Sequence, residues 1–150
     1  MSAKMPVFAQ VNIVARRFDE TLRFYRLLGL EIPEPVNQPP GALHATANTS
    51  HGVAFEIDND FFVRTYSAAR RRGQDNAPVI LGASLASRAE VDETYARLVA
   101  AGHIGRQPPY DAFWGARYAI VADPEGNDVG LMSPVDESRK SWPPVNSPES

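Results

Sequence analysis

The chain of 150 residues contains no cysteine. This absence excludes disulfide bonds, thiolate zinc sites, iron–sulfur clusters and a cysteine nucleophile. Histidine is scarce as well: there are three, with no H-x-H or H-x-x-x-H spacing among them. The sequence therefore has none of the compact histidine patterns that are typical of metal sites.

The sequence also lacks a long apolar stretch and an excess of positive charge. No run of about 18 apolar residues occurs, so we expect no membrane-spanning segment and no membrane partner. Residues Met1 to Gln10 lack the apolar core of a signal peptide, which makes the cytoplasm the expected location. The formal net charge is −3, so we expect no nucleic-acid partner, because binding phosphates requires a clustered positive face.

What remains is the composition of one globular domain, with 43% hydrophobic and 22% charged residues. Proline is abundant, with thirteen residues, and its clusters are expected to mark loops and edges because proline lacks a backbone donor. We expect the domain to cover residues 1–134. Residues 135–150 are rich in Pro and Ser, with Trp142 as the one large anchor, and are expected to form a disordered tail or surface arm that contributes little to stability.

A repeat with an offset of 73 residues divides the domain into two modules. The tripeptide Asp19-Glu20-Thr21 recurs as Asp92-Glu93-Thr94, and Gly29 recurs as Gly102 at the same spacing. In each copy an apolar, β-branched run precedes a polar cap and a helical pattern that ends at the glycine. Short strand patterns follow each helix. Each module is therefore predicted to fold as β-α-β-β-β.

The modules are expected to span residues 6–59 and 78–134, with residues 60–77 as the connection. Strands after the two helices are predicted at residues 30–32, 42–47, 53–57, 103–107, 117–121 and 127–132. The connection opens with Phe61 and Phe62, one of which should pack while the other lines a surface. It also contains Arg70-Arg71-Arg72 and could hold a short helix. The triple arginine could indicate a phosphate site, but a solvated helix end or linker is the favoured interpretation.

Two segments make the chain resemble a known family. Residues 22–30, LRFYRLLGL, are similar to that family's first helix, and Phe113-Trp114-Gly115 precede a turn with the sequence Asp123-Pro124-Glu125-Gly126-Asn127. With the repeat, residues 7–134 resemble the vicinal oxygen chelate superfamily, which includes glyoxalase I, bleomycin-resistance proteins, fosfomycin-resistance enzymes and extradiol dioxygenases. The resemblance implies an α+β fold in which two βαβββ modules form cupped mixed sheets around a cavity. It also implies a homodimer.

The resemblance further implies where a divalent metal would bind in catalytic members, through His or Gln and Glu on the first and last strand of each module. In the first module these positions are Gln10 and Glu56. In the second they are Gly130 and one of residues 80–83, none of which has a ligating side chain. Because a catalytic ion needs about three protein ligands, we expect no metal and no cofactor. The branch that this pattern favours is the metal-free binding branch.

Several polar residues are candidates for the cavity. Gln10 and Asn12 alternate with apolar neighbours on the first strand, which would turn both toward the cavity; a solvent-facing edge is the alternative. Glu56 alternates in the same way, and inside a cupped sheet its carboxyl would have a raised pKa and could act as a general base. A surface carboxylate is the alternative. His44 could pair with Glu56, and His44 or His51 could replace a missing metal ligand.

The densest aromatic stretch follows two prolines and is expected to form a loop at the cavity mouth. Tyr110, Phe113 and Trp114 would supply flat surfaces on which an aromatic ligand stacks. Arg117 could meet an acidic ligand or pair with Asp111. The alternative is that these rings plug the open side of the sheet or form a dimer seam.

Three functions remain open at this point. The first is a metal-free pocket, formed between two chains, that sequesters an aromatic or planar small molecule such as an antibiotic. The second is a metal-independent isomerase, lyase or cyclase with Glu56 as its general base. The third is a metal-dependent glyoxalase-type lyase or dioxygenase with improvised ligands. The missing metal ligands and the aromatic stretch favour the first.

Overall fold

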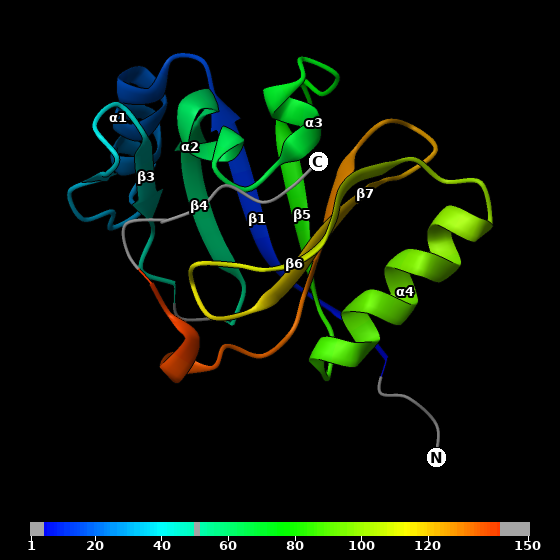
Figure 1. Ribbon diagram of the computed structural model, residues 1–150. Helices are drawn as coiled ribbons and strands as arrows, with labels where there is room; N and C mark the ends of the chain where they lie inside the picture. Colours follow the sequence, from blue (N-terminus) through cyan, green and yellow to red (C-terminus); the bar gives the residue numbers. More distant parts are fainter. Residues whose placement is uncertain (1–4, 50–51, 142–150) are drawn as a thin grey trace.

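The computed structural model describes residues 5–49 and 52–141, and its strands form one curved mixed sheet (Figure 1). The sheet has eight strands in the order β2-β3-β4-β1-β5-β8-β7-β6. The predicted α+β class is confirmed. Among the described residues, no helix has the length and apolar character needed to cross a membrane.

The first module follows the predicted order of elements with one difference. Its elements are β1 (Val7–Ala15), α1 (Phe18–Leu28), β2 (Val36–Asn37), β3 (Leu43–Thr46) and β4 (Ala54–Asn59). Helix α1 ends at Gly29, which has φ 117° and is in the left-handed region, as the repeat predicted. The strand expected at residues 30–32 does not form. Pro33 and Pro35 follow directly and cannot donate to a ladder, so pairing begins only at β2.

The connection and the second module contain the remaining elements. They are α2 (Asp60–Arg64), α3 (Ala68–Arg71), β5 (Val79–Ser84), α4 (Arg88–Ala100), β6 (Gly105–Asp111), β7 (Arg117–Ala122) and β8 (Asp128–Met132). Strand β6 continues through Pro108 and Pro109, beyond the predicted residues 103–107. This is possible because β6 is the edge strand, and the register shifts between Gln107 and Tyr110 where the prolines lie.

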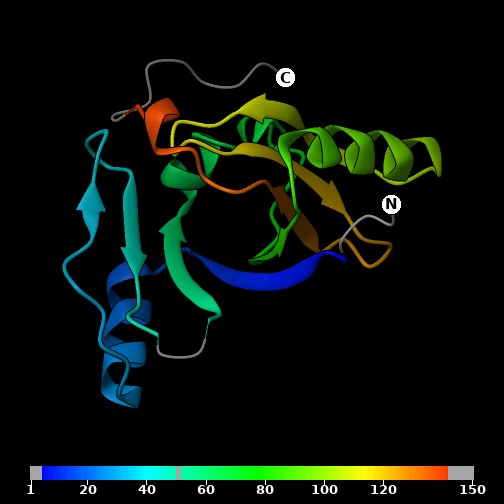
Figure 2. The ribbon, with the colours of Figure 1, turned by 90° about the horizontal axis from the view of Figure 1, so that it is seen from below.

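The two modules join within one chain through their first strands. β1 is parallel to β4 and antiparallel to β5, and β5 is in turn parallel to β8. Gln10 therefore lies opposite Gly82 at the seam between the modules. Figure 2 shows that the sheet curls, with α1 and α4 on its outer side. The expected cupped mixed sheet is confirmed.

Apolar side chains form three buried clusters, two outside the curve and one inside. Phe18 and Leu22 of α1 pack against β1 and β4, and Val91 of α4 packs against β7 and β8. The third cluster is on the inner side and includes Phe62 and Tyr66 from the connection. The connection thus closes one end of the curved sheet and contributes side chains to its interior.

The triple arginine of the connection is structural. Arg70 is only 7% exposed, and its Nε lies 2.7 Å from Oδ1 of Asp60 while its Nη1 donates to the carbonyl of Ala77 at 2.8 Å. Nη1 of Arg71 donates to the carbonyl of Arg64 at 2.7 Å. The helix-end interpretation is therefore supported, although Arg70 is buried and not solvated.

The described part of the C-terminal segment lies along the hairpin between β6 and β7. The amide of Asp136 donates to the carbonyl of Gly115 at 2.9 Å, and the amide of Ser141 donates to the carbonyl of Phe113 at 2.8 Å. A short 3-10 helix covers Glu137–Arg139. Trp142, the expected anchor, lies outside the described residues. Residues 135–141 therefore form an ordered arm on the hairpin.

Candidate functional site

A cavity of about 430 Å³ lies on the inner side of the curved sheet, and one chain supplies both of its halves, where we expected the pocket to form between two chains. Five polar residues, the polar floor, line one part: Gln10, Asn12, His44, Glu56 and Asp58. Five aromatic residues, the aromatic wall, line another: Phe62, Tyr66, Phe113, Trp114 and Tyr118. Val36, Met132 and Val135 complete the lining.

The alternation along β1 turns Gln10 and Asn12 into the cavity, as predicted. Their neighbours Ile13 and Ala15 point the other way, into the cluster beneath α1. Nε2 of Gln10 donates to Oε2 of Glu56 at 3.0 Å, and Nδ2 of Asn12 donates to the same oxygen at 2.9 Å. Two amides from β1 therefore hold one oxygen of a carboxylate on β4.

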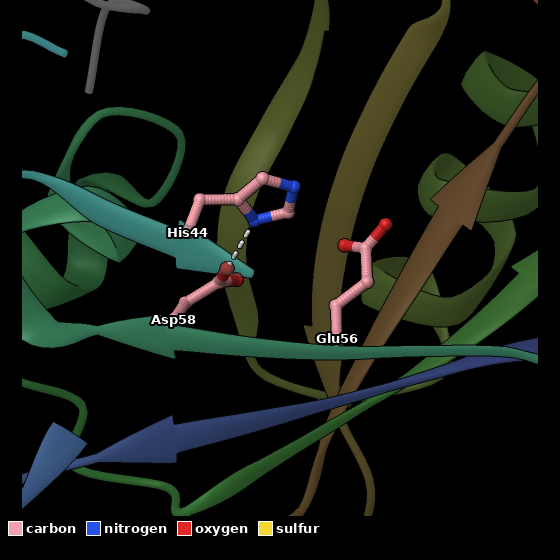
Figure 3. A group of neighbouring side chains, drawn as sticks. All are labelled: His44, Glu56 and Asp58. Carbon is pink, nitrogen blue, oxygen red and sulfur yellow. Dashed lines mark hydrogen bonds and ion pairs between the residues drawn. The ribbon is translucent and has the colours of Figure 1, made fainter. Parts of the chain in front are cut away.

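Asp58 is the residue of the polar floor that the sequence interpretation missed. It is fully buried and accepts hydrogen bonds from Nδ2 of Asn12 and from the hydroxyl of Tyr66, both at 3.0 Å. Its other oxygen lies 2.5 Å from Nδ1 of His44 (Figure 3). Because Asp58 is two residues after Glu56 on the same strand, the alternation that pointed to Glu56 could have identified it.

His44 is held by a carboxylate on one side and a ring on the other. Its ring stacks on Phe62 with centroids 4.6 Å apart, and its Nε2 lies 3.2 Å from Oγ1 of Thr46. Burial lowers the pKa of His44, but the hydrogen bond to Asp58 and the charges of Asp58 and Glu56 outweigh it and raise the pKa above its ordinary 6.5. With Asp58 orienting Nδ1, His44 can exchange a proton at Nε2.

Glu56 is partly buried beside this pair and rises from β4 to the same side as Asp58 (Figure 3). Burial raises the pKa of Glu56 above its ordinary 4.5, and the charge of Asp58 adds to the effect. The charge of His44 and the hydrogen bond from Asn12 oppose it. The raised pKa agrees with the expectation from the sequence. The site thus contains a carboxyl and an imidazole whose pKa values are both raised.

The aromatic wall is a packed unit. The ring of Trp114 has its centroid 4.9 Å from that of Phe113, 5.0 Å from that of Tyr118 and 6.0 Å from that of Tyr66, all in edge-to-face arrangements. Its Nε1 donates to the sulfur of Met132 at 3.3 Å. Phe113 and Trp114 therefore line the cavity and at the same time pack against the inner cluster. Tyr66 and Met132 were not predicted.

Two predicted site residues are not brought to the cavity. The guanidinium of Arg117 pairs with Asp92 at 2.8 Å and with Asp111 at 3.3 Å, so it makes the alternative contact that we considered and does not line the pocket. Tyr110 packs its ring near Trp114, with centroids 6.5 Å apart, but is not among the lining residues. In β7, Arg117 is followed by Tyr118, which lines the cavity in its place, because neighbouring residues on a strand face opposite sides.

The metal positions that the resemblance implies are closed in the second module. A Cβ atom added at Gly130 would lie 2.6 Å from the hydroxyl oxygen of Tyr118, and one added at Gly82 would lie 2.7 Å from Cβ of Gln10. Neither position has room for a ligating side chain. The residues present therefore do not fit the metal site of the catalytic members, because only the two positions of the first module, Gln10 and Glu56, have ligating side chains.

A different group of ligand atoms lies within the first module. Atoms of His44, Glu56 and Asp58 are all within 4.8 Å of one another, which is close enough to surround an ion. Two of its members, His44 and Asp58, are however already in hydrogen-bond contact, and an ion would have to replace that contact. His51, the other substitute we considered, lies outside the described residues.

Comparisons with known proteins agree with this fold. A model of the Glyoxalase/Bleomycin resistance protein/Dioxygenase superfamily matches residues 7–131, whereas no curated protein matches the chain. A hypothetical protein from Bacillus halodurans has a similar structure, with 15% identity, a TM-score of 0.60, and coverage of 89% of this chain and 97% of that one. A member of the superfamily from Vibrio splendidus has 8% identity, a TM-score of 0.57, and coverage of 87% and 100%.

The Mn(II)-bound glyoxalase from Novosphingobium aromaticivorans is also similar, with 18% identity and a TM-score of 0.53. The match covers 95% of this chain and 43% of that one. At such identities the structural matches establish the fold alone. The family model, in contrast, spans most of the sequence. This chain therefore belongs to the glyoxalase/bleomycin resistance protein/dioxygenase superfamily.

Proposed function

We propose that this protein binds a small, planar aromatic molecule in its cavity without a resident metal ion, and so sequesters a compound such as an antibiotic in the cytoplasm. The observation that carries the proposal is the meeting of the aromatic wall and the polar floor around about 430 Å³. Cavities of about 300–1,000 Å³ with apolar walls and a few fixed polar groups are typical of sites for small molecules. Packed rings offer flat surfaces for stacking, and the amide and carboxyl groups fix the orientation.

A thermal-shift screen of aromatic natural products tests this function directly. A ligand at 100 times its dissociation constant should stabilise the protein by about 2.7 kcal/mol. For a hit, Trp114→Ala should weaken binding by roughly 2 kcal/mol or more in calorimetry, as loss of a buried aromatic anchor does. Phe24→Ala, on the exposed side of α1, is the matched control and should leave affinity unchanged. Equal affinity of the Trp114→Ala variant would contradict the assignment of the site.

A second function is favoured by one observation, the partly buried Glu56 carboxyl, with its raised pKa, beside the pair of His44 and Asp58. Two titratable groups with raised pKa values in a cavity can pass a proton to and from a substrate, as an isomerase, lyase or cyclase requires. Prolonged incubation of a ligand with the protein, followed by product analysis, separates the two functions. Turnover that falls by about 10²- to 10⁴-fold in Glu56→Gln would establish the enzyme.

The metal-free state is part of the proposal and has its own test. The closed positions at Gly82 and Gly130 support it. Elemental analysis of purified protein, before and after incubation with zinc, nickel, manganese and iron salts, should find no stoichiometric metal. Stoichiometric binding that is lost in His44→Ala would instead assign an ion to the group of His44, Glu56 and Asp58.

A further inference from the structure

The cavity has an uneven distribution of ionisable groups. Its lining includes two carboxyl groups, Glu56 and Asp58, and, among the residues that the structure describes, neither lysine nor arginine. The nearest candidate from the sequence, Arg117, is engaged with Asp92 and Asp111 instead. His44 is thus the one described lining residue that can carry positive charge, and its charge is directed to Asp58.

Of the two carboxyl groups, Glu56 is the one that a ligand can reach. Asp58 is fully buried and accepts hydrogen bonds from His44, Asn12 and Tyr66, so its acceptor capacity is used within the protein. Glu56 is only partly buried, and both amide donors, from Gln10 and Asn12, go to its Oε2. No donor from the described residues reaches Oε1. The polar floor therefore presents Oε1 of Glu56 as an acceptor to which a ligand can donate a hydrogen bond.

The aromatic wall, like the carboxyl groups, attracts positive charge. The π faces of Trp, Tyr and Phe rings carry partial negative charge and attract a cation within about 6 Å of the ring centre. Trp114 lies with its centroid 5.0 Å from that of Tyr118, so more than one ring can approach the same ligand. A neutral ligand would use the area of these rings but would leave the charge of the floor uncompensated.

We propose that the ligand of this cavity is an organic cation, a protonated amine with an aromatic body, whose ammonium group donates to Oε1 of Glu56 while its ring stacks on the aromatic wall. This inference rests on the proposed function, because it names the class of ligand for the same cavity. It assigns Glu56 the role of a counter-ion. The pair of His44 and Asp58 then keeps the neighbouring charge internally balanced.

Three indoles that differ in one group test the charge of the ligand: tryptamine, a cation; tryptophol, its neutral alcohol; and indoleacetate, an anion. By calorimetry near neutral pH, tryptamine should bind about tenfold more tightly than tryptophol, and indoleacetate should bind most weakly. Glu56→Gln should lower the affinity for tryptamine to that for tryptophol and should leave the affinity for tryptophol unchanged. Glu93→Gln, the same change on the exposed side of α4, is the control for net charge and should alter neither affinity.

A measurement on the unaltered protein keeps the test valid if Glu56→Gln does not fold. The groups that face Glu56 are Gln10 and Asn12 from β1, His44 from β3, Asp58 from β4, and the hydroxyls of Tyr66 and Tyr118. Glu56 and His44 both have raised pKa values and lose their protons as the pH rises. The affinity for tryptamine should therefore increase from acidic to neutral pH, while that for tryptophol stays constant.

The outcomes distinguish this inference from the function on which it rests. If tryptophol or indoleacetate binds as tightly as tryptamine, the cavity still binds an aromatic molecule and the cationic assignment is overturned. An affinity for tryptamine that does not change with pH also overturns it. If none of the three indoles binds at millimolar concentration and the wider aromatic screen is empty as well, both the inference and the proposed function are wrong.

Discussion

Nδ1 of His44 lies 2.5 Å from Oδ1 of Asp58, and this contact joins β3 to β4 at the centre of the polar floor. The carboxylate is fully buried, whereas the imidazole keeps 21% of its side-chain surface exposed toward the cavity. A buried carboxylate thus determines the protonation of a group that the cavity can reach. Its influence can be measured without any knowledge of the ligand.

Asp58→Asn should reverse the direction of the pKa shift of His44. In the native protein burial lowers this pKa, and Asp58 provides most of the opposing effect through its hydrogen bond and its charge. An asparagine keeps the shape but removes the charge, so the pKa of His44 should fall below its ordinary 6.5. NMR titration of the imidazole nitrogens measures it. Glu56→Gln, which removes a weaker influence, should lower the pKa less; equal shifts in the two variants would contradict the order of causes.

A second buried carboxyl should make stability depend on pH. Asp128 is fully buried, with Nε of Arg106 at 3.4 Å from its Oδ1. Burial and Asp75 raise its pKa to about 8, against the opposing charge of Arg106. The folded protein therefore retains a proton that the unfolded chain releases above 3.8. The stabilisation is complete below that pH and is lost as the pH rises toward 8, by at most roughly 1.4 kcal/mol per pH unit.

Denaturant unfolding of the native protein and of Asp128→Asn over this pH range checks the dependence. The difference between the two free energies of unfolding should decrease as the pH rises, because the asparagine cannot titrate. Glu125→Gln, in the exposed turn before β8, should keep the native slope. A native protein whose stability rises between pH 5 and 8 would contradict the raised pKa of Asp128.

The ordered arm at residues 135–141 should contribute to stability, in contrast to the small contribution expected from the sequence. A chain that ends at Pro134 loses the hydrogen bonds from Asp136 and Ser141 to the hairpin. Two such bonds are worth about 1–3 kcal/mol together, so the melting temperature should fall by several degrees. A chain that ends at Ser141 keeps both bonds and is the control. If the two chains melt together, the arm does not stabilise the hairpin.

We also propose that the protein is a homodimer, as the family resemblance implies. Helix α1 carries three exposed apolar side chains at helical spacing, Phe24, Leu27 and Leu28. Sedimentation at micromolar concentration should give twice the 16.5 kDa of one chain, and Leu27→Asp should give the mass of one chain. Val99→Asp, on α4, is the control that should remain a dimer. A native mass of 16.5 kDa would contradict the proposal.

The sequence predicted the parts of the site that depend on local pattern. Alternation along β1 and β4 identified Gln10, Asn12 and Glu56, because a strand fixes which side each residue faces. The repeat predicted the order of elements, and Gly29 predicted the end of the first helix. Each of these features depends on a short local pattern of residues and not on contacts between distant segments.

What the sequence did not predict depends on contacts between distant segments. Tyr66 reaches Asp58 only because the connection docks on the inner side of the sheet. Phe61 and Phe62 indicated that one ring of the connection would pack, but not on which side of the sheet. Tyr110 was expected in a loop at the cavity mouth, but β6 extends through the two prolines and pairs it with Tyr118, where its ring packs against the inner cluster. Arg117, in contrast, could have been excluded from the sequence, because alternation along a strand turns either Arg117 or Tyr118 toward the cavity and not both.

The polar floor comes entirely from the first module, whereas every ring of the aromatic wall comes from residues after the first module ends. The first module and the residues that follow it therefore contribute different chemistry to the cavity. Substitutions in the hairpin between β6 and β7 can change the size and outline of the cavity while the hydrogen bonds among β1, β3 and β4 stay intact. Such a division lets the shape of the cavity change one substitution at a time while its polar part is held constant.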